Sequence, residues 1–156
     1  MHQQLWLASY GSIPHTINPD AYPSVVAMLD AAMVTYADKS AFTCFGQTLT
    51  YADVDKKSRA FAAYLQTKLG VKKGDRVAVM VPNFFAFPIA LLGIARAGAV
   101  QVNVNPMYTP RELEHQLNDA GVQTIVIFSG VSATLAEIIG KTSENITIVC
   151  TPASLS

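Results

Sequence analysis

The sequence predicts an α/β fold built on an open, mainly parallel sheet with helices on its faces. From residue 24 onward, β-prone runs alternate with helical patterns, and the crossovers are long enough to join parallel strands. The run 76–81 is almost wholly apolar, which is typical of a strand covered on both faces. The right-handed preference of such crossovers then places helices on the faces of the sheet.

The expected elements follow one another in a regular order. A hairpin with strands 41–45 and 48–50 is joined by a two-residue turn at Gly46-Gln47, where the glycine supplies a positive φ. The expected helices are 24–36, 50–69, 84–97, 110–120 and 131–139, and the later strands are 76–81, 100–104, 124–128 and 146–150.

Polar side chains that can satisfy unpaired backbone groups mark three of the helix starts. Ser24 fits an N-cap, and Thr50 with Asp53 has the spacing of a capping box. Thr109 and Glu112 repeat that spacing around a proline at the first helical position, which is the strongest local signal in the chain. These residues predict where the three helices begin.

Composition bounds the class of protein. The chain has 156 residues, of which 51% are hydrophobic and 14% charged, against roughly 25% charged in an ordinary soluble domain. Eleven basic residues balance eleven acidic ones, so no global field attracts nucleic acid and no nucleic-acid partner is expected. So few charges fit either a sheet covered on both faces or a piece of a larger body.

The N-terminal segment and the cysteines indicate a cytoplasmic protein. Residues 1–22 form an expected irregular arm, which Trp6 and Tyr10 can dock and which lacks the pattern of a secretory signal. The longest apolar stretch, 84–95, is too short to span a membrane. Cys44 and Cys150 lack a metal-binding spacing and are expected to be unpaired, buried thiols in a reducing compartment.

No motif assigns a catalytic, cofactor-binding or metal-binding residue, so none is predicted. Glycine-rich phosphate loops are absent from the sequence, and Gly93, Gly98 and Gly121 are interpreted as close packing and helix ends. His115 falls away from the apolar stripe of its helix and is expected on the surface. Glu112 is already explained by capping.

Two weaker features have competing interpretations. Residues at the carboxyl ends of the expected strands mark the edge where ligands bind in open α/β sheets, although turn formation is the favoured explanation for them; they are Asn83, Asn105, Pro106 and Ser129. A basic stretch could meet anionic lipid or a phosphorylated ligand, but an ordinary solvated surface is favoured; it comprises Lys56, Lys57, Arg59, Lys68, Lys72, Lys73 and Arg76.

The order of motifs resembles the N-terminal region of the adenylate-forming acyl-CoA ligases, particularly the bacterial long-chain fatty acid-CoA ligases. The resemblance covers residues 24–150. It rests on LTYADV at 49–54, GVKKGDRVAVMVPN at 70–83, ARAGAV at 95–100, NVNPMYTPREL at 103–113 and DAG at 119–121. The last two segments indicate the fatty-acid branch of the family.

The resemblance implies that residues 23–156 are the N-terminal α/β subdomain of a larger, truncated adenylation domain. It implies a two-step reaction in which a fatty acid and ATP form an acyl-adenylate, and coenzyme A then displaces AMP, with Mg²⁺ accompanying the ATP. The family's phosphate loop, nucleotide pocket and catalytic lysine have no counterpart here, so the isolated chain is expected to be inactive.

Two alternatives stay open: a stand-alone binding or oligomerisation module on a ligase-like scaffold, and an adenylating enzyme for another carboxylic acid. A fragment should expose an apolar patch through which it can dimerise, whereas a module should have a closed, polar surface. Peripheral contact with the inner membrane also stays open, because family members that take fatty acids from it often lie on its surface.

Overall fold

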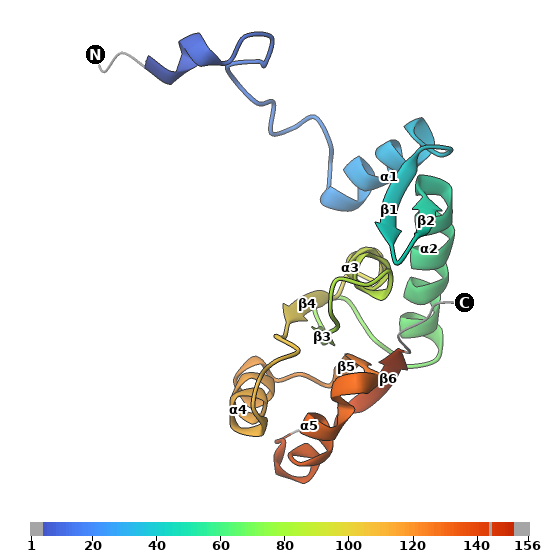
Figure 1. Cartoon of the computed structure of the whole chain (residues 1–156), viewed down its shortest axis with the longest axis vertical. Coiled ribbons are helices and arrows are strands. Elements are labelled where there is room, and N and C mark those ends of the chain that lie inside the picture. The colour runs from blue at the N-terminus through green and yellow to red at the C-terminus, as the bar shows by residue number, and fades with distance from the viewer. Residues whose placement is uncertain (1–4, 144, 152–156) are drawn as a thin grey trace.

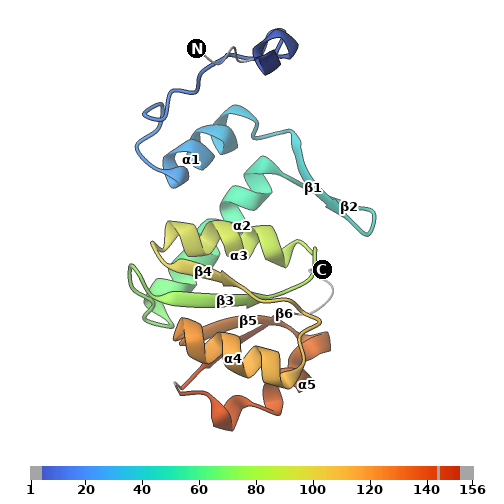
Figure 2. The ribbon, with the colours of Figure 1, turned by 90° about the vertical axis from the view of Figure 1, so that its left-hand side faces the viewer.

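The computed structural model describes residues 5–143 and 145–151, and its centre is a four-stranded parallel sheet in the order β4-β3-β5-β6. The strands are β3 (Arg76–Met80), β4 (Val100–Asn103), β5 (Thr124–Phe128) and β6 (Thr147–Thr151). The predicted open, parallel sheet is therefore confirmed. In Figure 2 the strands lie between two layers of helices.

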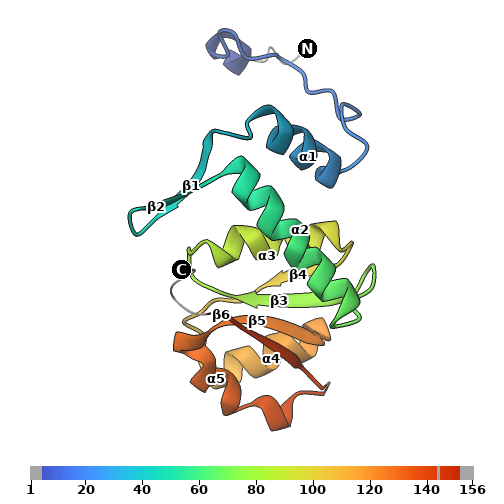
Figure 3. The same cartoon turned by 90° about the vertical axis from the view of Figure 1, so that its right-hand side faces the viewer.

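Helices cover the two faces of this sheet in pairs. One face carries α2 (Tyr51–Thr67) and α3 (Ala86–Arg96), and the other carries α4 (Pro110–Ala120) and α5 (Ser132–Ala136) (Figure 3). The short helix α1 (Val25–Thr35) packs on α2 and α3 at the end of the molecule that is remote from α4. Each face buries its own apolar core.

Alternate residues of the central strands supply the two cores. Val77 and Val79 of β3 point toward α2 and α3, where Leu65 and Ile94 are buried. Ala78 and Met80 point to the other side, where buried side chains of α4 and α5 meet them. Because strand side chains alternate between faces, the apolar run of β3 serves both cores at once.

The three helix starts predicted from capping residues are confirmed. The Ser24 side chain accepts a hydrogen bond from the Ala27 amide, and complete capping boxes join Thr50 to Asp53 and Thr109 to Glu112. Gly121 ends α4 in a left-handed conformation, with φ of 59°. Local hydrogen bonding therefore sets these boundaries.

The hairpin turn lies one residue earlier than predicted. Strands β1 (Ser40–Cys44) and β2 (Gln47–Thr50) pair Cys44 with Gln47, so the turn residues are Phe45 and Gly46 rather than Gly46 and Gln47. Both have positive φ, 49° and 77°, as a tight hairpin turn of this hand requires. The left-handed conformation is uncommon for a bulky side chain, which is why the sequence did not indicate Phe45.

Two predicted helices are wrong in extent. The continuous helix expected over 131–139 is broken into a 3-10 turn (Ser129–Val131), α5 and a second 3-10 turn (Ile139–Lys141). The Ile138 amide bonds the Leu135 carbonyl, three residues back, and burial of both side chains holds the segment without a regular helix. The helix expected from residue 84 begins at Ala86, and the residue before it, Phe85, makes no side-chain cap hydrogen bond.

The arm and the cysteines also differ from expectation. The described part of the arm contains a 3-10 turn (Leu5–Ser9) and runs away from the sheet (Figure 1). Trp6 is 59% exposed and the Tyr10 ring packs on His15 of the arm itself, so these side chains do not hold the arm to the sheet. Both cysteines are free thiols, as predicted, but Cys150 is exposed and Cys44 only half-buried.

Among the helices of residues 5–143 and 145–151, none combines the length and the apolar character that crossing a bilayer requires.

Candidate functional site: an aromatic pocket at the carboxyl edge of the sheet

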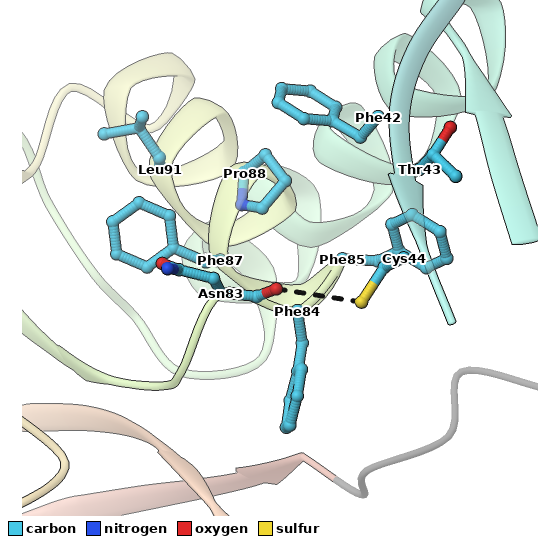
Figure 4. Close-up of a pocket in the computed structure, with 9 residues that line it drawn as sticks. All are labelled: Phe42, Thr43, Cys44, Asn83, Phe84, Phe85, Phe87, Pro88 and Leu91. Carbon is cyan, nitrogen blue, oxygen red and sulfur yellow. Dashed lines mark hydrogen bonds between the residues drawn. The ribbon is translucent and has the colours of Figure 1, made fainter. Parts of the chain in front are cut away.

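A pocket opens where β3 ends and α3 begins. Its volume is about 250 Å³, and the hairpin closes it from one side (Figure 4). The lining residues are Phe42, Thr43, Cys44, Asn83, Phe84, Phe85, Phe87, Pro88 and Leu91. Carboxyl ends of parallel strands are where ligands bind in such sheets, so this is the strongest candidate site among the described residues.

Local sequence explains why the α3 side of the pocket is aromatic. Pro82 and Asn83 end the strand segment, and two phenylalanines follow before the helix starts. Pro88 lies in the first turn of α3, where its missing amide costs no helical hydrogen bond. The turn can therefore present Phe84 and Phe87 at the pocket, on opposite sides of Asn83 (Figure 4).

Aromatic contacts tie three separate elements together beside the pocket. The Phe84 ring lies 5.6 Å from the Phe45 ring of the hairpin turn and 5.2 Å from the Phe128 ring at the end of β5, as measured between centroids. The second pair is edge-to-face, a favoured arrangement for aromatic rings. The Cys44 thiol donates to the Asn83 carbonyl oxygen at 3.7 Å.

The chemistry of this pocket is that of an apolar contact surface. The described residues that line it are uncharged, and only Thr43, Cys44 and Asn83 bring side-chain polar atoms. The phosphates of ATP need cationic or amide donors, and Mg²⁺ needs oxygen ligands. Within the described ranges no three His, Cys, Asp or Glu side chains form a metal-binding group. The residues present do not fit ATP-Mg²⁺.

The four strand-end residues of the sequence analysis separate in the structure. Asn83 lines the pocket, while Asn105, Pro106 and Ser129 do not. The Asn105 side chain accepts a hydrogen bond from the Met107 amide, so the turn interpretation holds for it. The Ser129 carbonyl accepts from the Ser132 hydroxyl at the start of the broken helix.

A cluster of charged side chains joins three helices. The Arg96 side chain is 8% exposed and bonds Asp30 of α1 and Asp55 of α2, each at 2.7 Å. Arg59 bonds the same two carboxylates, at 3.1 and 2.9 Å, and its hydrogen bond to Asp55 raises its pKa above the ordinary value. Two cations balance two anions, so we interpret this cluster as a structural link among α1, α2 and α3.

The remaining polar features are also structural. Backbone hydrogen bonds from Thr50 and Thr109 hold the pKa of Asp53 and of Glu112 below their ordinary values. His115 is exposed, as predicted. All seven members of the basic stretch are exposed as well, which agrees with a solvated surface.

The glycine interpretation is confirmed where it can be measured. A Cβ atom at Gly93 would lie 2.6 Å from Cδ1 of Phe61 and 3.1 Å from the Ser58 carbonyl oxygen. Gly93 therefore lets α3 approach α2 closely. Gly98 has φ of 75° just beyond α3, which favours glycine there.

Sequence reasoning missed the aromatic pocket. The apolar run from Phe84 predicts a buried helix, and Phe42 and Cys44 come from a hairpin about forty positions earlier. Only the fold brings these segments together. The spacing of Phe84, Phe85 and Phe87 after a strand end was the one local signal.

Comparison with known proteins identifies the family to which the sequence is similar. A long-chain-fatty-acid–CoA ligase from Escherichia coli is 52% identical over 142 residues, which is 90% of this chain and 25% of that protein. The corresponding ligases of Haemophilus influenzae and Bacillus subtilis are 44% and 40% identical over 90% and 80% of this chain, and 25% and 22% of their own lengths. The chain thus spans about a quarter of the curated relatives that it matches.

Solved structures agree. A long-chain-fatty-acid-CoA ligase from Archaeoglobus fulgidus superposes with a TM-score of 0.75 at 27% identity, covering 83% of this chain and 28% of that one. A luciferase-like enzyme from Zophobas morio shares the fold, with a TM-score of 0.80 at 22% identity over 90% of this chain and 34% of its own. The family model described as "AMP-binding enzyme" matches residues 29–154, and the chain belongs to that family of AMP-binding enzymes.

Proposed function

We propose that this chain is the N-terminal part of a long-chain fatty acid-CoA ligase that joins fatty acids to coenzyme A through an acyl-adenylate. The observation that carries the proposal is the 52% identity over 90% of the chain to a curated ligase of that specificity. A 4-coumarate–CoA ligase from rice, which bears on the alternative of another carboxylic acid, is 33% identical over 80% of the chain. The fatty-acid branch is therefore the better supported.

The role that we propose for these residues is structural. The sheet supplies a rigid base, and its carboxyl edge presents the aromatic pocket to the rest of the ligase. ATP, Mg²⁺ and coenzyme A are proposed to be bound by residues outside this chain, because the described pocket residues are uncharged. We accordingly propose no catalytic, cofactor-binding or metal-binding residue here, and we expect the 156 residues alone to be inactive.

A chimera tests this proposal. The matching quarter of the Escherichia coli ligase is replaced by this chain, and ATP–pyrophosphate exchange is measured with a long-chain fatty acid such as oleate. The parent ligase and the isolated 156-residue chain are the controls. We expect exchange from the chimera and none from the isolated chain.

Two results would overturn the proposal. A chimera that folds, by circular dichroism and gel filtration, yet shows no oleate-dependent exchange would exclude the role as a ligase segment. Exchange catalysed by a pure sample of the isolated chain would contradict the assignment of the catalytic groups to other parts of the protein.

The proposed location is the cytoplasm, where the free thiols of Cys44 and Cys150 are stable. Peripheral membrane contact through the exposed basic stretch is testable by sedimentation with anionic and neutral liposomes. Equal partitioning to both would remove the electrostatic form of this idea, because attraction to anionic lipid depends on charge.

A further inference from the structure

The polar groups of the aromatic pocket are already bonded within the protein. The Cys44 thiol donates to the Asn83 carbonyl oxygen at 3.7 Å, and the Thr43 hydroxyl lies 2.9 Å from the hydroxyl of Thr48 on the neighbouring strand. A polar ligand would give up its water there and gain few hydrogen bonds in return, which is unfavourable. The pocket therefore favours a ligand, or a part of one, that is hydrocarbon.

Charge keeps the ionic part of a substrate out of the pocket. The described lining residues carry no charge, so neither a carboxylate nor a phosphate gains a cationic partner among them. Burial of an unpaired anion costs far more free energy than burial of a neutral group. The end of a ligand that enters the pocket is therefore the end remote from its ionised group.

Contacts behind the pocket hold its aromatic wall in place. The Phe84 ring packs edge-to-face on the Phe128 ring, at 5.2 Å between centroids. Phe128 in turn lies so close to Gly130 that a Cβ atom added to this glycine would be 2.4 Å from Cε1 of the ring. The wall is therefore braced by residues outside the pocket, and it is preformed as in most small-molecule sites.

The pocket follows one side of α3. Phe87 and Leu91 are four residues apart, so with Pro88 they line the same side of the helix (Figure 4). The volume of about 250 Å³ lies just below the roughly 300–1,000 Å³ of pockets that enclose a whole small molecule. A pocket of this size, extended along a helix, suits the end of a flexible chain.

We propose that this pocket binds the methyl end of the fatty acyl chain. A long acyl chain supplies the uncharged hydrocarbon that the lining fits, while its carboxyl group stays outside the pocket, toward the rest of the ligase. The inference rests on the proposed function. It makes Phe87 and Leu91 determinants of the chain length that the ligase accepts.

The two free cysteines provide a test with an internal control. Cys44 lines the pocket, whereas Cys150 is exposed on β6 and lies outside it. The chimera described above is labelled with N-ethylmaleimide, with and without oleate, and peptide mass spectrometry follows the labelling rate of each thiol. At an oleate concentration about ten times its Kd, labelling of Cys44 should slow about tenfold, because only the unoccupied pocket reacts. Labelling of Cys150 should not change.

The dependence on the ligand identifies what occupies the pocket. Among saturated fatty acids, each further methylene group that enters the pocket should lower the protecting concentration about fourfold. Protection of Cys44 should therefore rise steeply with chain length until the pocket is full. Protection by 4-coumarate but not by oleate would identify an aromatic ring as the occupant and would overturn the proposal.

One substitution and a matched control separate the pocket from the reaction centre. Leu91→Trp fills the pocket from α3 and should raise the KM for oleate in ATP–pyrophosphate exchange about tenfold, which corresponds to the loss of nearly two buried methylene groups. The KM for octanoate, whose chain is shorter, should change far less. Met107→Trp, at an 88% exposed position of the β4–α4 loop, adds the same indole outside the pocket and should change neither KM.

The outcomes separate the inference from the function on which it rests. In an active chimera, a Cys44 that oleate does not protect, or that is unreactive before oleate is added, would overturn the acyl pocket and leave the ligase role intact. An equal rise of both KM values in Leu91→Trp would also overturn the pocket. A folded chimera that protects Cys44 with oleate but lacks oleate-dependent exchange would support the pocket and overturn the proposed function.

Discussion

Replacement of Gly93 by alanine tests whether the α2–α3 contact is as close as the structure shows. The new methyl group would lie 2.6 Å from Cδ1 of Phe61 and 3.1 Å from the backbone oxygen of Ser58. The phenyl ring can move, but the backbone oxygen can move only with α2. Overpacking of this kind costs about 2–3 kcal/mol, while replacing glycine within a helix returns about 1 kcal/mol.

The steric cost of overpacking is larger than the gain in helix propensity, so Gly93→Ala should destabilise the chain by about 1–2 kcal/mol. This corresponds to a melting temperature lower by roughly 2–8 °C. Urea unfolding followed by circular dichroism measures the change. Ala63→Gly, at an exposed position of α2, calibrates the helix term and should cost about 1 kcal/mol.

A double-mutant cycle checks the cause. Phe61→Leu removes the nearest ring atoms, so the double variant Gly93→Ala/Phe61→Leu should be less destabilised than the sum of the two single changes. A Gly93→Ala variant more stable than the parent would contradict a close α2–α3 contact, because helix propensity would then outweigh any steric cost.

Three further predictions concern the caps and the ion cluster. Thr109→Ala should destabilise the chain by about 1 kcal/mol by removing the N-cap of α4, and Thr109→Ser should restore most of it; urea unfolding that failed to separate the two would contradict this. The pKa of Glu112 is held below its ordinary value of 4.5, so the stability that its carboxylate contributes is present above pH 4.5 and is lost as the pH falls through the lower pKa of the folded state. Glu112→Gln should therefore flatten the decline of stability in acid. An unchanged decline in the variant would count against the cap. Arg96→Met should destabilise the chain by about 2–4 kcal/mol, because it leaves two partly buried carboxylates without their buried partner. Arg59→Met, at a side chain 54% exposed, should cost less than about 1 kcal/mol. Equal costs would mean that burial does not set the strength of this cluster.

Local signals in the sequence predict the fold well wherever a few neighbouring residues decide the outcome. Thr109 and Glu112 satisfy backbone groups within one helical turn, so the start of α4 could be predicted to the residue. The apolar run of β3 likewise predicts a central strand, because both of its faces need cover.

The features that escaped prediction depend on contacts between distant segments. Phe45 adopts its left-handed conformation beside the ring of Phe84, nearly forty residues later. The helix expected over 131–139 is broken although Leu135 and Ile138 are buried, since burial alone does not require a regular helix. The pocket belongs to the same class, because the hairpin and the start of α3 meet only after folding.

The most direct test of the proposed function is the sequence of the source gene beyond codon 156. The proposed function predicts an in-frame continuation that contains a Ser/Thr/Gly-rich loop ending in Pro-Lys-Gly, the phosphate loop that the resemblance to acyl-CoA ligases implies. A natural stop codon directly after codon 156 would contradict the proposed function, because the chain would then act alone as a module on a ligase-like scaffold.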